Sequence, residues 1–586
     1  MLDQANNYSV NRLRLYFALV AIIFGVFLIR LFYLQIIKHD YYRQAALANQ
    51  LKEYEIKAER GTIEVHDRGN VIPLVLNEKL YTLFADPKFI TDTKDASLKI
   101  VAVIGGNADD YQSKMKVQTR YSVLAKKLTA EYRTKLDDLK IKGIGTREEQ
   151  YRTYPQGSTA SQILGFVNDE GKGTYGVEQF FDSELKGTPG LLKAITDASG
   201  VPLVSSKDNV VNQPKAGKKV VLTIDLSMQR QLEEILKTGL ENGRAQSGSA
   251  LIIDPNTGKV KAMANLPTYN PAEFYKVEDT ALFTNPSVSA PLEIGSSMKP
   301  LTVAAALDKG VIGPDTTYFD PGIWTYDGYK ITNIEEHSGS GNRSIKDVLQ
   351  MSLNTGAVYV LKQFGGGELN EKGRIAWHDY LTNRYRFGKL TGIEQGYEAE
   401  GSVPDPKEGF GLNLQYANTS FGQGLSMTPL QMAAAFSSVI NGGIYYRPHL
   451  VDYFVDEQGN KQERKPEVLN NGVIKPAASQ QIKDLLNYSF SKNHLVYGMK
   501  NLRSEYDIGG KTGTAQIAKP GGGYYEDRYN GTFVGYIGGD NPEYVIFVRV
   551  NEPKIGGYAG AKAAAPIFSS TVNMLIDNFG VTPKSQ

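Results

Sequence analysis

Residues 295–300 read Gly-Ser-Ser-Met-Lys-Pro, which places a hydroxyl and an amine three positions apart. The apolar run at residues 301–307 predicts a helix that begins near Ser296, and Gly310 is a suitable place for it to end. Positions three apart share one face of a helix, so Ser296 and Lys299 are predicted to meet. A serine hydroxyl needs a neighbouring base to act as a nucleophile, and a lysine of lowered pKa can be that base.

The motif Ser-x-x-Lys is too short to establish a function by itself. A chain of this length contains roughly one or two such matches by chance. Ser113 and Lys116 form a second match, in a charged stretch. The functional interpretation of Ser296 therefore depends on what else the chain provides.

Composition excludes several classes of function. The chain has 586 residues, enough for about two to four domains. Its net charge of +2 lacks the basic excess typical of nucleic-acid-binding proteins, so we expect no nucleic-acid partner. It has no cysteine, and its six histidines are scattered without metal-ligand spacing. The sequence therefore gives no sign of a metal site.

The N-terminal region predicts a membrane anchor. Residues 1–14 are polar, as in a cytoplasmic tail, and residues 15–37 are mostly apolar, with Arg30 inside the run. A cleaved signal peptide and a buried helix of a soluble domain are the alternatives. No small-residue cleavage site follows, which favours a single-pass transmembrane helix that is retained. Residues 41–57 are polar with a helical pattern.

Two further domains are expected after the anchor. Residues 38–215 predict an elongated β-rich pedestal with a small head at about residues 88–150, and residues 216–586 predict the larger second domain. The second domain starts with strands and a helix, continues through a helical middle, and ends with strands and a closing helix. This order predicts an α+β fold, with helices against an antiparallel sheet. The strands expected near its C-terminus cover residues 509–517, 532–537 and 544–550, with a glycine- and tyrosine-rich loop at 519–529.

Two more short motifs follow Ser296 in order. Ser352-Leu353-Asn354 lies in a segment, residues 344–360, that is predicted to be helical. Lys511-Thr512-Gly513-Thr514 lies in the first of the C-terminal strands, where the glycine lets a ligand approach the backbone. Ser-x-x-Lys, Ser-x-Asn and Lys-Thr-Gly in this order are typical of penicillin-recognising serine acyltransferases.

The chain resembles the class B penicillin-binding proteins, which are monofunctional DD-transpeptidases of bacterial cell-wall synthesis. The resemblance covers nearly the whole length. The three motifs carry it, together with stretches shared with the family: Arg60-Gly61, Asp67-Arg68-Gly69, Tyr154-Pro155, Leu222-Thr223-Ile224-Asp225, Ser420-Phe421-Gly422-Gln423-Gly424, Thr428-Pro429-Leu430-Gln431 and Ala563-Ala564-Ala565-Pro566. Leu292 and Ile294 depart from the family, which more often has Tyr-Glu-Pro around Glu293, and Pro286 departs from the usual Asn-Arg.

The resemblance implies a serine β-lactamase-like catalytic fold and a set of catalytic roles. Ser296 would attack the penultimate D-Ala carbonyl of a stem peptide ending in D-Ala-D-Ala. Lys299 would be the base, although the identity of the base is debated in this superfamily. Ser352, helped by Lys511, would pass a proton to the leaving D-Ala. The reaction that the resemblance implies needs no metal and no cofactor.

The same resemblance implies the substrate contacts. Asn354 would bind the substrate amide or fix Lys299. Thr512 and Thr514 would bind the terminal carboxylate beside Gly513. The backbone N–H groups of Ser296 and Thr514 would form the oxyanion hole, in which one donor is typically worth about 3 kcal/mol. β-Lactam antibiotics would acylate Ser296.

The resemblance also implies a setting, and it leaves alternatives open. The catalytic domain would lie outside the cytoplasm, in the periplasm or at the cell surface. A SEDS-family glycosyltransferase and other membrane proteins of the divisome or elongasome would be partners. Residues 88–138 favour a septal role over an elongation role. The remaining alternatives are a β-lactamase, a β-lactam sensor and a non-catalytic scaffold.

Overall fold

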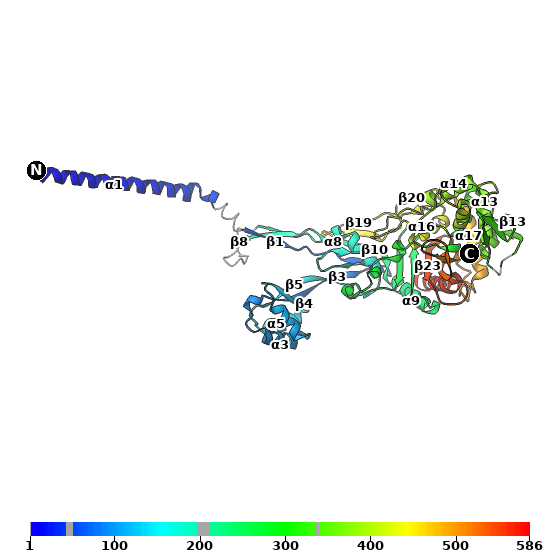
Figure 1. The fold of residues 1–586 in the computed structure, drawn as a ribbon, viewed down its shortest axis with the longest axis horizontal. Helices are drawn as coiled ribbons and strands as arrows, with labels where there is room; N and C mark the ends of the chain where they lie inside the picture. Colours follow the sequence, from blue (N-terminus) through cyan, green and yellow to red (C-terminus); the bar gives the residue numbers. More distant parts are fainter. Residues whose placement is uncertain (1, 43–50, 196–209, 335–336, 338, 586) are drawn as a thin grey trace. The chain divides into compact units, whose positions relative to one another are not determined.

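The computed structural model describes residues 2–42, 51–195, 210–334, 337 and 339–585. The chain forms two compact units. The first consists of residues 1–59 and 187–216, and the second of residues 60–186 and 217–586. Figure 1 shows the elements of each unit.

The first unit contains the apolar helix α1 (Leu2–Phe32), which continues as a π-helical turn, η1 (Tyr33–Ile37). The stretch Leu13–Ile37 is long and apolar enough to cross a membrane, and it is not buried in the structure. Burial is what a core helix of a soluble domain would show, so this exposure argues against that alternative.

The first unit also contains a small antiparallel sheet in the order β1-β8-β9. Its strands are β1 (Leu51–Ile56), β8 (Gly190–Ile195) and β9 (Val210–Asn212). The helical prediction for residues 41–57 is wrong for 51–56, and residues 43–50 lie outside the described residues. Strand β1 pairs antiparallel with β8, about 140 residues later in the sequence. Such long-range pairing overrides a local helical preference.

The second unit contains a seven-stranded sheet that joins distant parts of the sequence. Its path is β19-β18-β10-β2-β3-β4, and β5 also pairs with β3. These strands are β2 (Ile63–Asp67), β3 (Asn70–Ala85), β4 (Ser122–Leu128), β5 (Ile144–Thr153), β10 (Lys219–Asp225), β18 (Val451–Val455) and β19 (Lys461–Glu463). The pair β10–β2 is parallel, so one continuous sheet contains both N-terminal and C-terminal segments of this unit.

A small subdomain is built on the far end of β3, together with β4 and β5. Its helices are α3 (Thr93–Ile104), α4 (Ala108–Met115) and α5 (Ala130–Asp138). Each begins with a side-chain cap, from Asp92, Asn107 and Thr129 respectively. The subdomain has its own hydrophobic core, which includes Leu83, Ile100 and Leu136.

A five-stranded antiparallel sheet in the order β12-β11-β23-β22-β21 forms the centre of the larger part of the second unit. The strands are β11 (Ser247–Ile253), β12 (Val260–Leu266), β21 (Asp507–Ala518), β22 (Tyr524–Gly538) and β23 (Pro542–Asn551). Strand β22 begins at Tyr524, so the expected loop at residues 519–529 is shorter than predicted. Strand β21 lies at the edge of the sheet.

Helices cover both faces of this sheet (Figure 1). Successive residues of a strand point to opposite faces, so alternate residues of β23 pack against different helices. Ile546 and Val548 belong to one core with α9 (Leu226–Gly243) and α18 (Ala565–Phe579). Val545 and Phe547 belong to another core with α11 (Lys299–Lys309), α16 (Pro429–Ile440) and α17 (Pro476–Asn493). The expected α+β class is confirmed.

A buried ion cluster fixes the segment where β2 begins. Glu178, in the short helix α7 (Gly176–Phe180), is fully buried between two arginines. Arg60 contacts it at 2.6 Å and Arg152 at 2.7 Å. Arg60 also contacts Asp182 at 2.7 Å. The cluster therefore joins three segments that are far apart in the sequence.

Replacing Glu178 with Gln should lower the free energy of unfolding by about 3–5 kcal/mol, because two arginines would lose their shared buried counter-ion. Denaturant unfolding of the full chain in detergent would measure this. Glu131→Gln is the control, because Glu131 lies in an exposed pair with Lys135 and should have no measurable effect. A Glu178→Gln protein as stable as the Glu131→Gln protein would contradict the prediction.

Candidate active site

Ser296 lies in a 3₁₀ turn, η5 (Gly295–Met298), that leads directly into α11. Gly295 has φ +56° and donates its N–H to the Gly422 carbonyl at 3.0 Å. A Cβ atom on Gly295 would lie 2.5 Å from the Thr514 carbonyl oxygen, so only glycine fits there without a shift. Ser296 is partly exposed, whereas Lys299 is fully buried.

The Lys299 amine lies among four oxygen atoms. It donates to Ser296 Oγ at 2.8 Å and to Asn354 Oδ1 at 2.9 Å. The other two are the Ser352 carbonyl oxygen at 2.6 Å and Ser352 Oγ at 3.2 Å. Burial, and to a smaller extent the nearby charge of Lys511, lower the pKa of Lys299 well below its usual value. A neutral Lys299 amine would have a lone pair within reach of the Ser296 hydroxyl.

Ser352 does not lie in a continuous helix, so the helical prediction for residues 344–360 is wrong at this point. Helix α12 (Ile345–Gln350) ends before it, and α13 (Asn354–Phe364) begins after it. Ser352 has φ +58°, a left-handed conformation that costs a non-glycine residue roughly 1–2 kcal/mol. Its two contacts with Lys299 are the physical reason for the break, because they direct both Ser352 oxygens at the amine.

Asn354, the first residue of α13, is held from the opposite side by a hairpin that the sequence analysis missed. The hairpin consists of β14 (Ile323–Tyr326) and β15 (Tyr329–Thr332). Asn354 Nδ2 donates to the Thr332 carbonyl at 3.0 Å. Asn333 Oδ1 accepts from the Thr355 N–H at 3.0 Å and so caps α13, whose own N-cap residue makes no side-chain bond. These bonds leave Asn354 Oδ1 facing Lys299.

Strand β21 presents the third motif. Lys511 is buried, and its amine donates to Thr512 Oγ1 at 3.2 Å. Burial lowers the pKa of Lys511 to about 7. A Cβ atom on Gly513 would lie 2.2 Å from the Ile294 carbonyl oxygen, so the glycine allows this strand to pack against the segment before Ser296. Thr514 Oγ1 accepts from the Gly560 N–H at 3.0 Å, which leaves its own proton free to donate.

The structure therefore brings Ser296, Lys299, Ser352 and Asn354 together through direct bonds. It places Lys511 close enough to act on the pKa of Lys299. The neighbouring Ser297 links the nucleophile turn to β21, because its hydroxyl donates to the Lys511 carbonyl oxygen at 3.4 Å. Among the described residues, no group of three or more His, Asp or Glu side chains is arranged to hold a metal ion.

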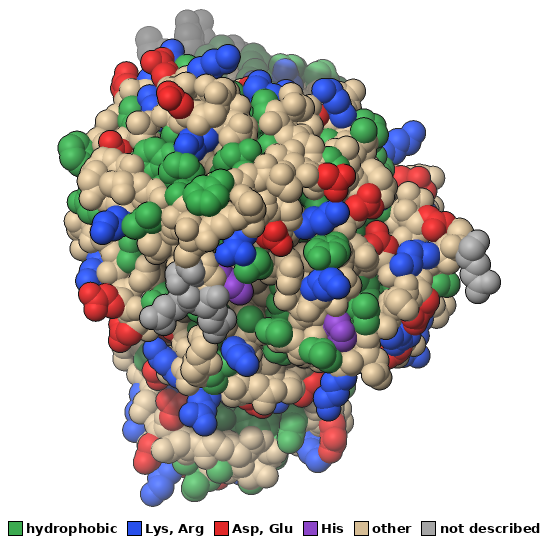
Figure 2. Space-filling model, turned by 90° about the vertical axis from the view of Figure 1, so that its right-hand side faces the viewer, with side chains coloured by type: hydrophobic (Ala, Val, Ile, Leu, Met, Phe, Trp, Pro, Cys, Tyr) green, Lys and Arg blue, Asp and Glu red, His purple; other side chains and the backbone are tan. Residues whose placement is uncertain are grey.

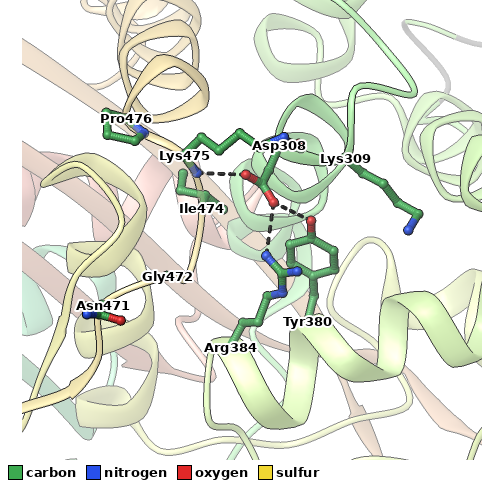
Figure 3. Close-up of a pocket in the computed structure, with 9 residues that line it drawn as sticks. All are labelled: Asp308, Lys309, Tyr380, Arg384, Asn471, Gly472, Ile474, Lys475 and Pro476. Carbon is green, nitrogen blue, oxygen red and sulfur yellow. Dashed lines mark hydrogen bonds and ion pairs between the residues drawn. The ribbon is translucent and has the colours of Figure 1, made fainter.

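A cavity of about 540 Å³ lies at the opposite end of α11 from Ser296 (Figure 3). Asp308 accepts there from the Lys475 N–H at 2.7 Å, from Arg384 at 3.0 Å and from Tyr380 OH at 2.5 Å. Asp308 follows Lys299 by nine positions in this helix, a rise of roughly 14 Å. The cavity therefore marks the ion pairs that fix the end of α11, and the reaction chemistry lies at the start of the helix.

The face of the molecule that Figure 2 shows has mixed charge. Figure 2 shows basic and acidic side chains interspersed on the face turned toward the viewer, with hydrophobic side chains between them. A continuous basic field, which nucleic-acid binding would require, is not present on this face.

Two protein-family models match the chain and show the family to which it belongs. Residues 248–573 match the penicillin binding protein transpeptidase domain, and residues 55–222 match the penicillin-binding protein dimerisation domain. The chain is a class B penicillin-binding protein. All three short motifs of this penicillin-binding protein lie within the transpeptidase match. Its apolar helix, together with this family membership, indicates a membrane-anchored protein.

Relatives of this penicillin-binding protein align over nearly all of it. Stage V sporulation protein D of Bacillus subtilis is 29% identical over 99% of this chain and 88% of its own length. Peptidoglycan D,D-transpeptidase FtsI of Escherichia coli K12 is 27% identical over 94% of this chain and 89% of its own length.

Solved structures agree on the fold. Penicillin binding protein 2X of Streptococcus thermophilus matches with a TM-score of 0.71 and 22% identity, over 91% of this chain and 83% of its own. The apo form of penicillin binding protein 3 of Mycobacterium tuberculosis matches with a TM-score of 0.66 and 25% identity, over 90% of this chain and 98% of its own.

Proposed function

We propose that the chain is a peptidoglycan D,D-transpeptidase that crosslinks stem peptides through an acyl-enzyme on Ser296. The observation that carries this proposal is the buried Lys299 amine, 2.8 Å from Ser296 Oγ, with its pKa lowered. A serine hydroxyl becomes a nucleophile when such a base takes its proton.

In the first half of the reaction, Ser296 Oγ attacks the carbonyl carbon of the penultimate D-Ala and its proton passes to Lys299 Nζ. The bond from that carbon to the amide nitrogen breaks, and terminal D-Ala leaves as an amine after accepting a proton. Ser352 Oγ, 3.2 Å from Lys299 Nζ, is suited to pass that proton on. Lys511 adds positive charge beside this path.

The substrate would be held by groups on β21. The hydroxyl oxygens of Thr512 and Thr514 each accept a hydrogen bond from within the protein, from Lys511 and from the Gly560 N–H respectively. The Thr514 hydroxyl proton is therefore available for a terminal carboxylate, whereas the Thr512 hydroxyl also bonds to Tyr497. The Ser296 and Thr514 backbone N–H groups would form the oxyanion hole, and the start of α11 favours negative charge there.

We also propose the cellular setting. Residues 15–37 would span the membrane, residues 38–215 would form the pedestal and residues 216–586 the catalytic domain, on the extracytoplasmic side. The relatives named FtsI favour a septal role over elongation. A SEDS-family glycosyltransferase would be the membrane partner, and β-lactams would act as inhibitors by acylating Ser296.

Mass spectrometry of the protein after reaction with benzylpenicillin tests the proposal. The adduct should lie on the peptide that contains Ser296, and it should persist. An adduct on another residue would show that the nucleophile is elsewhere. Rapid loss of the adduct with release of hydrolysed penicillin would instead indicate a β-lactamase.

The pH dependence of acylation should be bell-shaped. As pH rises, Lys299 loses its proton at a pKa below the usual value and becomes able to act as a base, so the rate increases. Above about pH 7 Lys511 loses its charge as well, and the rate should decline. Because the two lysines interact, the rising and falling limbs of the pH profile both reflect the coupled ionisation of Lys299 and Lys511. Acylation rates with benzylpenicillin from about pH 5 to pH 9 would measure this, and a flat profile would contradict it.

A further inference from the structure

The segment that precedes Ser296 is enclosed on two sides. On one side, Leu292 pairs with Met427, and the Gly295 N–H bonds to Gly422. On the other side, the Ile294 carbonyl oxygen lies against Gly513 of β21. Residues 292–295 therefore link the loop at 421–427 to strand β21.

Glu293 connects this segment to a third element. Its Oε1 atom accepts from the Gly424 N–H at 2.9 Å and from Tyr524 OH at 3.0 Å. Its Oε2 atom is buried and has no hydrogen-bond partner in the structure. Tyr524 is the first residue of β22. One carboxylate oxygen thus joins the nucleophile segment, the loop at 421–424 and the start of β22.

The part of the β21–β22 hairpin beyond Thr514, residues 515–530, is weakly held by the sheet itself. We call these residues the hairpin arm. Gln516 pairs with Tyr529 and Ala518 with Tyr524, so residues 525–528 bulge out between two pairs. Few ladder bonds fix the arm there. Arg528 ties one side of the arm to Glu552, with bonds of 2.7 and 2.6 Å. The bond from Tyr524 to Glu293 joins the arm to the nucleophile segment.

The arm lies where it would act on an acyl-enzyme. Strand β21 is an edge strand, and an extended peptide bound along it beside Thr512 and Thr514 would continue next to the arm. An arm held closed excludes water from the ester, and an arm that opens admits it.

We propose that Glu293 is a positioning residue that holds the hairpin arm closed through Tyr524, so that the acyl group is transferred to an amine and not to water. The proposal rests on the proposed Ser296 acyl-enzyme. In transfer, a neutral amine nitrogen bonds to the ester carbonyl carbon, the bond from that carbon to Ser296 Oγ breaks, and one amine proton passes to Oγ. In hydrolysis, a water oxygen takes the place of the nitrogen.

The test measures how the acyl-enzyme divides between the two acceptors. The full chain in detergent is given an N-acyl-D-alanyl thioester as donor and D-alanine as the acceptor amine, and the ratio of transfer product to hydrolysis product is measured. Tyr524→Phe removes one hydroxyl, and Glu293→Ala removes the acceptor of both bonds. Tyr525→Phe is the matched control, because it removes the hydroxyl of the neighbouring tyrosine on the same arm.

We expect Tyr524→Phe to lower the ratio about fivefold, the change that one hydrogen bond of ordinary net strength produces. Glu293→Ala should lower the ratio at least as much, and adding Tyr524→Phe to it should lower it no further. Glu293→Gln keeps an oxygen that can accept both bonds, so its ratio should be close to that of the wild type. If Glu293 acted only through its negative charge, Glu293→Gln would lower the ratio as much as Glu293→Ala does. Tyr525→Phe should leave the ratio unchanged.

If the wild-type protein is acylated at Ser296 and Tyr524→Phe leaves the ratio unchanged, the role of Glu293 and Tyr524 is overturned, and the proposed function is not affected. The same result in Glu293→Ala would also overturn that role, and if that variant fails to fold, Tyr524→Phe decides. Wild-type protein that forms no acyl-enzyme at Ser296 would overturn the proposed function, and this inference with it.

Discussion

Replacing Ser296 with alanine is expected to abolish covalent labelling by penicillin and to leave the protein folded. Ser296 is partly exposed in η5, and the hydrogen bond from Lys299 is what its hydroxyl contributes in the structure. Alanine fits the turn without a clash. Loss of a serine nucleophile lowers the rate by at least about 10⁴-fold, so labelling should fall below detection.

Fluorescent-penicillin labelling, with thermal unfolding as the check on folding, would measure this. Ser113→Ala is the matched control, since Ser113 belongs to the second Ser-x-x-Lys match but lies exposed in α4. It should label like the wild type. Labelling of a folded Ser296→Ala protein would show that another residue is the nucleophile.

The second large effect is expected at Lys299. Replacement with methionine keeps an unbranched side chain in a fully buried position and removes the amine. Acylation should slow by about 10²–10⁴-fold, the contribution typical of a positioned general base. Asn354 Oδ1 and the Ser352 carbonyl would also lose a donor, so some loss of stability should accompany the change.

The measurement is the acylation rate constant with benzylpenicillin, with the amount of folded protein determined separately. Lys309→Met is the control, because Lys309 lies at the exposed end of the same helix. It should acylate at the wild-type rate. A Lys299→Met protein within tenfold of the wild type would assign the base to another group.

The sequence predicted β21 and β23 to within about two residues, but it placed the start of β22 at residue 532, whereas the strand begins at Tyr524. The closing helix that the sequence predicts is α18, at Ala565–Phe579. Features that depend on long-range pairing were missed. Strand β1 carried a helical pattern, and Glu178 gave no local sign that Arg60, 118 residues earlier, would be its partner.

In the predicted site, too, the features set by local spacing were predicted and those that depend on distant residues were missed. The i, i+3 spacing was sufficient to predict that Ser296 and Lys299 meet. The left-handed turn at Ser352 could not be predicted, because its cause is a lysine 53 residues earlier. Glu293 was noted only within a stretch that departs from the family. Its bond to Tyr524, 231 residues later, has no signal in the local sequence.

The parallel pair of β2 and β10 has a practical consequence for the study of this enzyme. A fragment that starts near residue 216 would contain β10 without its neighbour β2, and a row of backbone N–H and C=O groups would be left unpaired. Gly61 and Gly217 allow these two segments to touch, because a Cβ atom on Gly61 would lie 1.8 Å from the Lys218 carbonyl oxygen. A fragment that lacks residues 60–186 is therefore expected to be less stable than one that contains them. A soluble enzyme suitable for crystallisation or inhibitor screening should retain residues 60–186.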